Sequence, residues 1–406
     1  PGGREAGDAA GEGHDAVTFV RWLPVRRVAS RALGGISFGV SGLLAGCAAA
    51  PGAVPGEGRD TPLPTATDVE VGLPPGMWQD LLNELEARRM PVDQIGVLVD
   101  GRLIGAKHYG GHSSTTLHDL RSATKPVTSL LLGIAIDRGL IDNVDAPIDR
   151  FFPEFTAHPS RGAFAPLTLR HLVTHRSGLD CTDWRDSPGN EERMYRTGDW
   201  ARFFYGIPAV AEPGSRFSYC TAAVVMLGEV IARAAGRPLP DFARERLFEP
   251  LGIHEARWAD AGAGITDAGG HLHLSLESLL KLGELTRTNG VGRGRRTVSA
   301  TWIADSMAPA GDIDAPRIQA RMGRLWWLEP VRDGVARSWQ ARGNGGQLVM
   351  VVPEFKLVVA ATGRAYNAAP EVQWAPFSLV QRWLIPALTG RALPEGTPSR
   401  GAALPR

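Results

Sequence analysis

The spacing of hydrophobic residues predicts helices and strands through the central part of the chain. An amphipathic repeat over residues 77–89 predicts a helix, and apolar runs at 95–100 and 102–109, broken at Gly101, predict a β-hairpin. The long apolar stretch 122–138 is followed by a glycine, as a helix that ends there would be. The first half of the folded part is therefore expected to contain one helix, one hairpin and a long buried helix.

The second half continues with helices and ends in strands. Helices are predicted at 167–174 and 222–235, and strands rich in Val and Leu at 348–352 and 357–362 flank a turn. A closing helix is predicted at 371–388. This order indicates an α+β fold in which an antiparallel sheet joins strands from opposite chain ends. Helices from the two ends flank the sheet, and the helical middle forms a second lobe.

The two ends of the chain have a different composition. Four arginines between positions 21 and 31 introduce the apolar run 32–46, a pattern typical of an export signal. The run ends in Leu-Ala-Gly before Cys47, which resembles a bacterial lipoprotein box and implies lipidation of Cys47; an ordinary secretory signal is the alternative. The predicted parts are an upstream extension plus signal at 1–46, a Pro/Gly/Ala-rich tether at 47–67, a folded domain at 68–390 and a disordered tail at 391–406. We expect an exported protein of the bacterial cell envelope, attached to the membrane through a lipid anchor.

Composition narrows the classes of partner. Hydrophobic residues make up 43% of the chain and charged residues 21%, values that allow a real core. The net charge is +1, so no nucleic-acid partner is indicated. Lysine occurs at only four positions, and arginine supplies nearly all the positive charge. Because arginine does not lose its proton in proteins, a lysine kept in such an arginine-rich chain is a candidate base.

Ser122 and Lys125 are the candidate chemical pair. A serine hydroxyl is a weak nucleophile and needs an adjacent base, and residues at i and i+3 share one face of a helix. If Ser122 opens the helix, its unpaired backbone N–H can also stabilise a developing oxyanion. A lone S-x-x-K motif is common by chance, and a surface Ser–Lys pair on an ordinary helix is the alternative.

Further motifs follow downstream at suitable intervals. They are Leu167-Thr-Leu-Arg-His171-Leu-Val-Thr-His175-Arg-Ser-Gly178-Leu, Pro213-Gly-Ser-Arg-Phe-Ser-Tyr219-Cys-Thr221, Leu247-Phe-Glu-Pro-Leu-Gly-Ile253 and Arg342-Gly-Asn344-Gly-Gly-Gln347. With the segment around Ser122, they resemble the class C-like branch of the serine β-lactamase and penicillin-binding-protein superfamily. The resemblance covers about residues 68–390. It implies a β-lactamase/transpeptidase-like fold and a serine hydrolase that uses no cofactor and no metal.

The resemblance also implies a role for each matching residue. Ser122 attacks the substrate carbonyl and becomes the acyl-enzyme, and Lys125 accepts the proton of Ser122. Tyr219 relays that proton to the leaving group. The backbone N–H groups of Ser122 and Asn344 form the oxyanion hole.

Two departures from the family pattern bear on the substrate. Thr221 stands where the family has Asn, and the K-T-G strand reads Ala341-Arg342-Gly343, so the lysine that meets a β-lactam carboxylate is missing. These changes favour a small-molecule ester or amide substrate, as in the family's esterases and in 6-aminohexanoate-dimer hydrolase. A catalytically silent penicillin-binding-protein-like envelope protein, or a weak β-lactamase or D,D-peptidase, is the alternative. The candidate substrate-binding residues are Thr221, Arg342, Gly343, Gly345 and Trp184.

Cysteines and histidines give two further hypotheses. Once Cys47 is lipidated, Cys181 and Cys220 are the remaining cysteines, and in an oxidising compartment they are expected to form a disulfide; two buried free thiols are the alternative. His171 and His175 have a spacing that can bind zinc, but no third ligand stands nearby in a recognisable pattern. Structural hydrogen bonds are therefore favoured for both. The sequence leaves the oligomeric state open.

Overall fold

The computed structural model describes residues 60–155, 166–258, 264–313, 320–331 and 337–390. The predicted signal, the lipidation site Cys47 and the C-terminal tail lie outside these ranges. Part of the predicted tether lies inside them and is bound to the domain: the N–H of Thr61 donates to the carbonyl of Gly252, and that of Ala66 to Leu103. Ordered contacts with the domain therefore begin before position 68.

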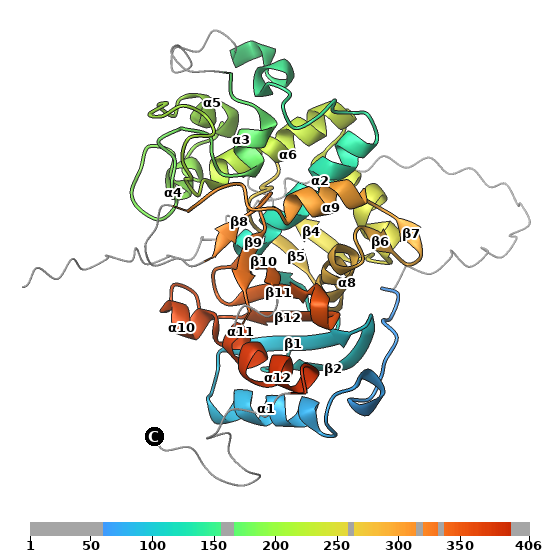
Figure 1. The fold of residues 1–406 in the computed structure, drawn as a ribbon. Helices are drawn as coiled ribbons and strands as arrows, with labels where there is room; N and C mark the ends of the chain where they lie inside the picture. The colour runs from blue at the N-terminus through green and yellow to red at the C-terminus, as the bar shows by residue number, and fades with distance from the viewer. Residues whose placement is uncertain (1–59, 156–165, 259–263, 314–319, 332–336, 391–406) are drawn as a thin grey trace, which may run out of the picture. The chain divides into compact units, whose positions relative to one another are not determined.

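One antiparallel sheet of seven strands organises the fold (Figure 1). The strand order is β2-β1-β12-β11-β10-β9-β8, and neighbouring strands pair antiparallel throughout. The prediction that strands from opposite ends of the chain pair in one sheet is confirmed, because β1 lies beside β12. The strands are β1 (Val92–Val99), β2 (Arg102–His108), β8 (Arg321–Met322), β9 (Trp327–Pro330), β10 (Arg337–Gly343), β11 (Gln347–Val352) and β12 (Leu357–Gly363).

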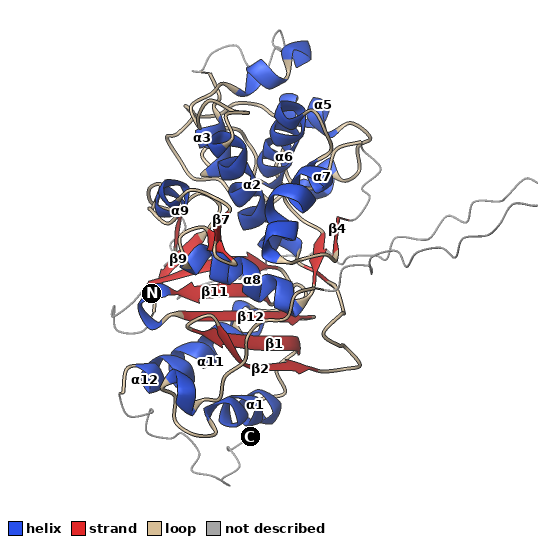
Figure 2. Cartoon of the chain, turned by 90° about the vertical axis from the view of Figure 1, so that its right-hand side faces the viewer, coloured by secondary structure: helices blue, strands red, loops and turns tan. Residues whose placement is uncertain are grey.

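Side chains alternate between two hydrophobic clusters, one on each face of the sheet. On one face, Ile95, Val97 and other residues of β1, β11 and β12 pack against helices α1 (Met77–Ala87), α11 (Ala375–Leu379) and α12 (Ile385–Leu388). On the other face, Leu98 and its neighbours pack against α8 (Leu276–Arg287), which Figure 2 shows crossing the sheet. The fully buried central strands thus separate two apolar layers.

The helical lobe lies beyond the β10 side of the sheet (Figure 1). Its helices are α2 (Lys125–Asp137), α3 (Leu169–Val173), α4 (Glu191–Met194), α5 (Trp200–Tyr205), α6 (Thr221–Ala235) and α7 (Leu239–Ala243). Helices α2 and α6 are buried over most of their length and pack against each other in the larger cluster. A small sheet of β3 (His118–Asp119), β5 (Leu272–Leu274) and β4 (Ala256–Trp258) adjoins the start of α2. The fold is therefore the expected α+β arrangement.

Two predicted helices have a different internal structure. The stretch 122–138 begins as a 3-10 turn, Arg121–Thr124, and becomes α-helical at Lys125. The closing helix is divided into α10 (Pro370–Gln373), α11 and α12, with a π-helical segment at Val380–Leu384. Each of these three helices has proline in its first turn. In α10 and α11 the missing N–H costs no helical hydrogen bond. Among the described residues, no helix has both the length and the apolar character needed to cross a membrane.

Candidate active site

Ser122 and Lys125 meet at the point where the 3-10 turn becomes helix α2. The Lys125 Nζ lies 3.0 Å from the Ser122 Oγ and also donates to the carbonyl oxygen of Gly269 at 2.8 Å. Lys125 is only 2% exposed, whereas Ser122 is half-buried. A buried amine held against a partly accessible hydroxyl is the arrangement that activates a serine nucleophile.

Tyr219 completes the group from the segment that leads into α6. Its hydroxyl hydrogen-bonds with Ser122, and the Lys125 Nζ lies 4.9 Å from its ring centroid. The His175 ring packs at 4.6 Å from the Tyr219 ring, and its Nδ1 accepts the backbone N–H of Cys220. His175 therefore fixes the Tyr219 segment, which agrees with the structural role expected for it. His171 has a similar local role, because its Nδ1 accepts the N–H of Thr168 at the start of α3.

The end of strand β10 approaches the nucleophile through a glycine. A Cβ at Gly343 would lie 2.2 Å from the Leu120 carbonyl oxygen and 3.0 Å from the Ala123 nitrogen, so no other residue fits there. Asn344 follows, and its side chain is fixed by Asn367: its Nδ2 donates to Asn367 Oδ1 at 2.8 Å, and its Oδ1 accepts the Asn367 N–H at 2.9 Å. This close approach packs the end of β10 directly against the start of the turn that carries Ser122.

An acidic cluster of Asp183, Glu191 and Asp267 surrounds the buried lysine. Burial is the largest influence on the pKa of Asp183 and, with the negative charge of Glu191, raises it to about 7, although Lys125 and the Thr221 hydrogen bonds lower it. Burial likewise raises the pKa of Asp267 above its ordinary value. The cluster supplies negative charge that partly compensates the cation of Lys125.

The pKa values of Lys125 and Tyr219 depend on each other. Burial lowers the pKa of Lys125, but Tyr219 and the acidic cluster raise it, and the net direction is upward. Burial raises the pKa of Tyr219, Lys125 and Ser122 lower it, and with the charges of Asp183 and Glu191 the net direction is upward. Both groups therefore hold their protons at neutral pH.

We expect Asp183→Asn to shift the acidic limb of the pH profile of kcat/KM to lower pH by about 1 unit. The negative charge of ionised Asp183 raises the pKa of Lys125, so its removal lets the Lys125–Tyr219 pair lose its proton more easily. Asp180→Asn is the matched control, because Asp180 lies in the same loop but pairs with Arg185. Identical profiles for folded wild type and Asp183→Asn would show that Asp183 has no influence on the base.

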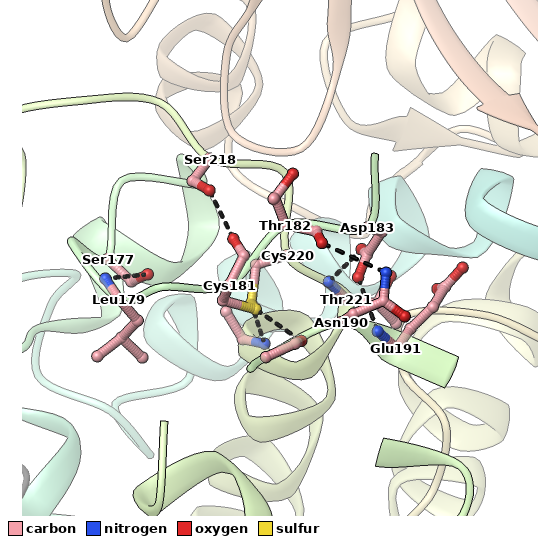
Figure 3. Close-up of a disulfide and its surroundings, with 12 residues drawn as sticks. Ser177, Leu179, Cys181, Thr182, Asp183, Asn190, Glu191, Ser218, Cys220 and Thr221 are labelled. Atoms are coloured by element: carbon pink, nitrogen blue, oxygen red, sulfur yellow. Dashed lines mark hydrogen bonds between the residues drawn. A yellow bond between two sulfur atoms is a disulfide. The ribbon is translucent and has the colours of Figure 1, made fainter. Parts of the chain in front are cut away.

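The disulfide hypothesis agrees with the structure, in which Cys181 and Cys220 are joined (Figure 3). Their Cα atoms lie 5.4 Å apart. Asp183 stands two residues beyond the bridge, and its carboxylate accepts the N–H groups of Thr221 at 2.8 Å and Glu191 at 3.0 Å. The bridge and this carboxylate together attach the loop after Cys181 to the N-terminus of α6, directly beside Tyr219.

The candidate substrate-binding residues differ in how accessible they are to a substrate. Trp184 is 46% exposed and stacks on Tyr219 with ring centroids 5.4 Å apart, and Trp327 stacks on Tyr219 at 5.9 Å. Thr221, by contrast, is fully buried, which does not fit the substrate contact expected for it. Arg342 is ion-paired with Glu329 and hydrogen-bonded to Gln340, so its cation is already engaged.

The glycines of the β10–β11 turn have backbone roles. Gly345 has φ +101°, and its N–H donates to the Gln373 side chain at 3.2 Å. A Cβ at this position would lie 2.7 Å from the Tyr366 ring. Gly343 and Gly345 therefore shape the turn around Asn344, without side chains of their own to offer a substrate.

Several residues of the site were not identified from the sequence. Asp183 and Asp267 reach Lys125 from distant segments, as does the Gly269 carbonyl. Asp119 accepts the N–H of Arg121 and contacts His271 Nδ1 at 2.9 Å. Burial raises the pKa of Asp119, but the hydrogen bonds and positive charges of His271 and Arg121 together lower it to about 2. The one available signal was local, since Asp119 stands in the same short motif as Ser122.

Comparisons with known proteins agree with this geometry. A protein-family model described as Beta-lactamase matches residues 78–376, well over half of the chain. Esterase EstB of Burkholderia gladioli is 31% identical over 156 residues, which are 36% of this chain and 39% of that esterase. A D-aminopeptidase of Cereibacter sphaeroides is 29% identical over 184 residues, 41% of this chain and 33% of that protein. Each alignment spans less than half of the curated relative.

Solved structures share the fold over a longer stretch. A Bacillus anthracis protein provisionally titled 6-aminohexanoate-dimer hydrolase aligns with a TM-score of 0.67 at 18% identity, covering 84% of this chain and 90% of that one. A family VIII carboxylesterase aligns with a TM-score of 0.59 at 17% identity, covering 78% and 98%. At these identities the likeness establishes a common fold, the β-lactamase/transpeptidase-like architecture.

Proposed function

The chain belongs to the Beta-lactamase family of serine hydrolases, and we propose that it cleaves an ester or amide bond through an acyl-enzyme on Ser122. The observation that carries this proposal is the 3.0 Å contact between Ser122 Oγ and the Nζ of the buried Lys125. Tyr219, hydrogen-bonded to the same hydroxyl, adds the second proton carrier.

The reaction begins when the Lys125–Tyr219 pair, short of one proton, accepts the proton of Ser122. The Oγ then bonds to the substrate carbonyl carbon, and the oxygen of the tetrahedral intermediate takes up negative charge. The N–H groups of Ser122 and Asn344 stabilise this oxyanion, a contribution of about 2.7–4 kcal/mol per donor in other enzymes. Tyr219 returns the proton to the departing alcohol or amine, and water repeats the steps to release the acid.

The surroundings of the nucleophile favour esters and neutral amides over β-lactams. Position 341 is alanine, and the adjacent Arg342 is engaged by Glu329, so the cation that would meet a β-lactam carboxylate is missing from this strand position. Trp184, Tyr219 and Trp327 form an aromatic wall beside Ser122, stacked on one another at 5.4–6.5 Å. The exposed ring of Trp184 offers a flat apolar surface, which favours an apolar group on the substrate.

An envelope location remains part of the proposal. The export signal and the lipidation of Cys47 are supported by the sequence pattern described above. The disulfide between Cys181 and Cys220 is consistent with them, because disulfides persist in oxidising compartments outside the cytosol. Membrane fractionation of cells producing the full chain and a Cys47→Ser variant tests the anchor: the variant is expected in the soluble fraction.

The activity is tested with a fluorophosphonate probe and a panel of p-nitrophenyl esters, nitrocefin and a D-Ala-D-Ala peptide. We expect one adduct per chain, located on Ser122 by peptide mapping, and faster turnover of the esters than of the other two substrates. Absence of an adduct on folded protein would favour a catalytically silent envelope protein. Faster cleavage of nitrocefin or the peptide would favour the weak β-lactamase or D,D-peptidase.

A further inference from the structure

Three side chains with metal-binding atoms meet away from the nucleophile. Asp93 lies at the start of β1, His112 lies in the connection after β2, and His118 opens β3. One ligand atom from each residue lies within 4.8 Å of the other two. Asp93 Oδ2 is 3.3 Å from His118 Nε2 and 3.8 Å from His112 Nε2. A single carboxylate oxygen therefore faces two imidazole nitrogens from different segments.

The three side chains are buried together without a well-formed hydrogen bond among them. His118 is only 8% exposed, and its buried Nε2 makes no hydrogen bond of normal geometry, although Asp93 Oδ2 lies 3.3 Å away. Asp93 is 3% exposed; its Oδ1 forms an ion pair with Arg364, while its Oδ2 faces the two histidines. A buried imidazole nitrogen without a well-formed hydrogen bond is costly in a folded protein, and a bound ion between it and the carboxylate would remove that cost.

The chemistry of the three side chains suits a metal ion. A neutral imidazole offers a nitrogen lone pair, and this is the form in which histidine binds metal ions. Two imidazoles and one carboxylate therefore present ligand atoms to a single point.

We propose that Asp93, His112 and His118 form a binding site for a divalent transition-metal ion, with Zn²⁺ as the best-fitting ion. Two ligands at the usual 2.0–2.1 Å from a tetrahedral zinc ion lie about 3.4 Å apart, close to the 3.3 Å between Asp93 Oδ2 and His118 Nε2. Imidazole ligands favour Zn²⁺ over the hard ions Mg²⁺ and Ca²⁺. Three protein ligands leave the fourth position of a tetrahedral zinc ion for water.

The position of this zinc site gives it a structural role. It joins the start of β1 to the connection that leads into the catalytic turn. Asp119 follows His118 directly, two positions before the turn that carries Ser122, and it hydrogen-bonds to Arg121 and His271. An ion that binds the folded protein but not the unfolded chain stabilises the folded state by mass action. Zinc is therefore expected to stabilise the segment that precedes Ser122.

The test uses the full chain, freed of metal with a chelator and titrated with Zn²⁺ or Co²⁺. We expect one equivalent to bind, visible absorption bands typical of tetrahedral Co²⁺, and a higher thermal midpoint with zinc. His112→Ala and His118→Gln are expected to weaken zinc binding by more than about 10-fold. His254→Ala, which removes an exposed histidine elsewhere, is the matched control and should bind as wild type does.

Two results would overturn the zinc site: no stoichiometric binding by the wild-type chain, or equal binding by His112→Ala and His118→Gln when both are folded. His112 is half-exposed, so its replacement is expected to preserve the fold even if that of His118 does not. Ser122→Ala protein should bind zinc as wild type does. The zinc site and the proposed hydrolase activity can therefore fail independently.

Discussion

Ser122→Ala is expected to lower kcat for p-nitrophenyl esters by about 10⁴-fold or more. The variant has no oxygen with which to form the acyl bond, while Lys125, Tyr219 and the backbone of Asn344 remain in place. Residual turnover would then come only from the oxyanion donors and substrate binding. Steady-state ester hydrolysis and labelling with a fluorophosphonate measure the two consequences, loss of turnover and loss of the covalent adduct.

Ser114→Ala is the matched control for this variant. Ser114 is exposed in the connection before β3, and no catalytic role is assigned to it. We expect this variant to keep the wild-type rate and the wild-type adduct. If Ser122→Ala kept its adduct, or more than a tenth of the wild-type turnover, the nucleophile would have to lie elsewhere.

Lys125→Met should lower kcat/KM by about 10²–10⁴-fold, the usual contribution of a positioned general base. Methionine has nearly the same length and is apolar, so it fills the space of Lys125 but cannot accept a proton. The change also leaves the acidic cluster without its cation, and removal of one member of a buried charge network costs about 3–5 kcal/mol. Stopped-flow acylation rates and thermal unfolding separate the effect on chemistry from the effect on stability.

Lys281→Met is the control that separates the loss of a catalytic base from the loss of stability. Lys281 is also buried, at 6% exposure, and its Nζ donates to the Gly252 carbonyl at 2.9 Å, near Glu277. This variant should lose stability as Lys125→Met does, yet keep its kcat/KM while folded. Equal losses of kcat/KM in the two variants would mean that Lys125 acts through the fold and is not a base.

The contact between Ser122 and Lys125 could be predicted because its information is local. Ser122 and Lys125 are three residues apart, so the helical repeat alone places them together. The same is true of β11 and β12, whose valine-rich runs flank a short turn, and of the hairpin of β1 and β2. Elements whose pattern and partners lie within a few positions were predicted to within a few residues.

The charge environment of the site could not be predicted in the same way. Asp183 and Asp267 reach Lys125 only after the loop beyond Cys181 and the segment before β5 have folded around it. The pairing of Arg342 with Glu329 was not predicted, because Glu329 lies on the neighbouring strand β9, far from Arg342 in the sequence. Contacts between side chains on adjacent strands depend on the order of the strands in the sheet. No local pattern of polar residues specifies that order.

The pairing of β1 with β12 has a consequence for biosynthesis. While the chain emerges from the ribosome, β1 has only β2 beside it, and its other edge stays unpaired until almost the whole domain has been made. Such an edge carries free backbone N–H and C=O groups, and it can pair with another chain. Products truncated before Leu357 would keep this edge permanently. They are expected to associate through β1, and a complete domain avoids this by closing its sheet with its last strand.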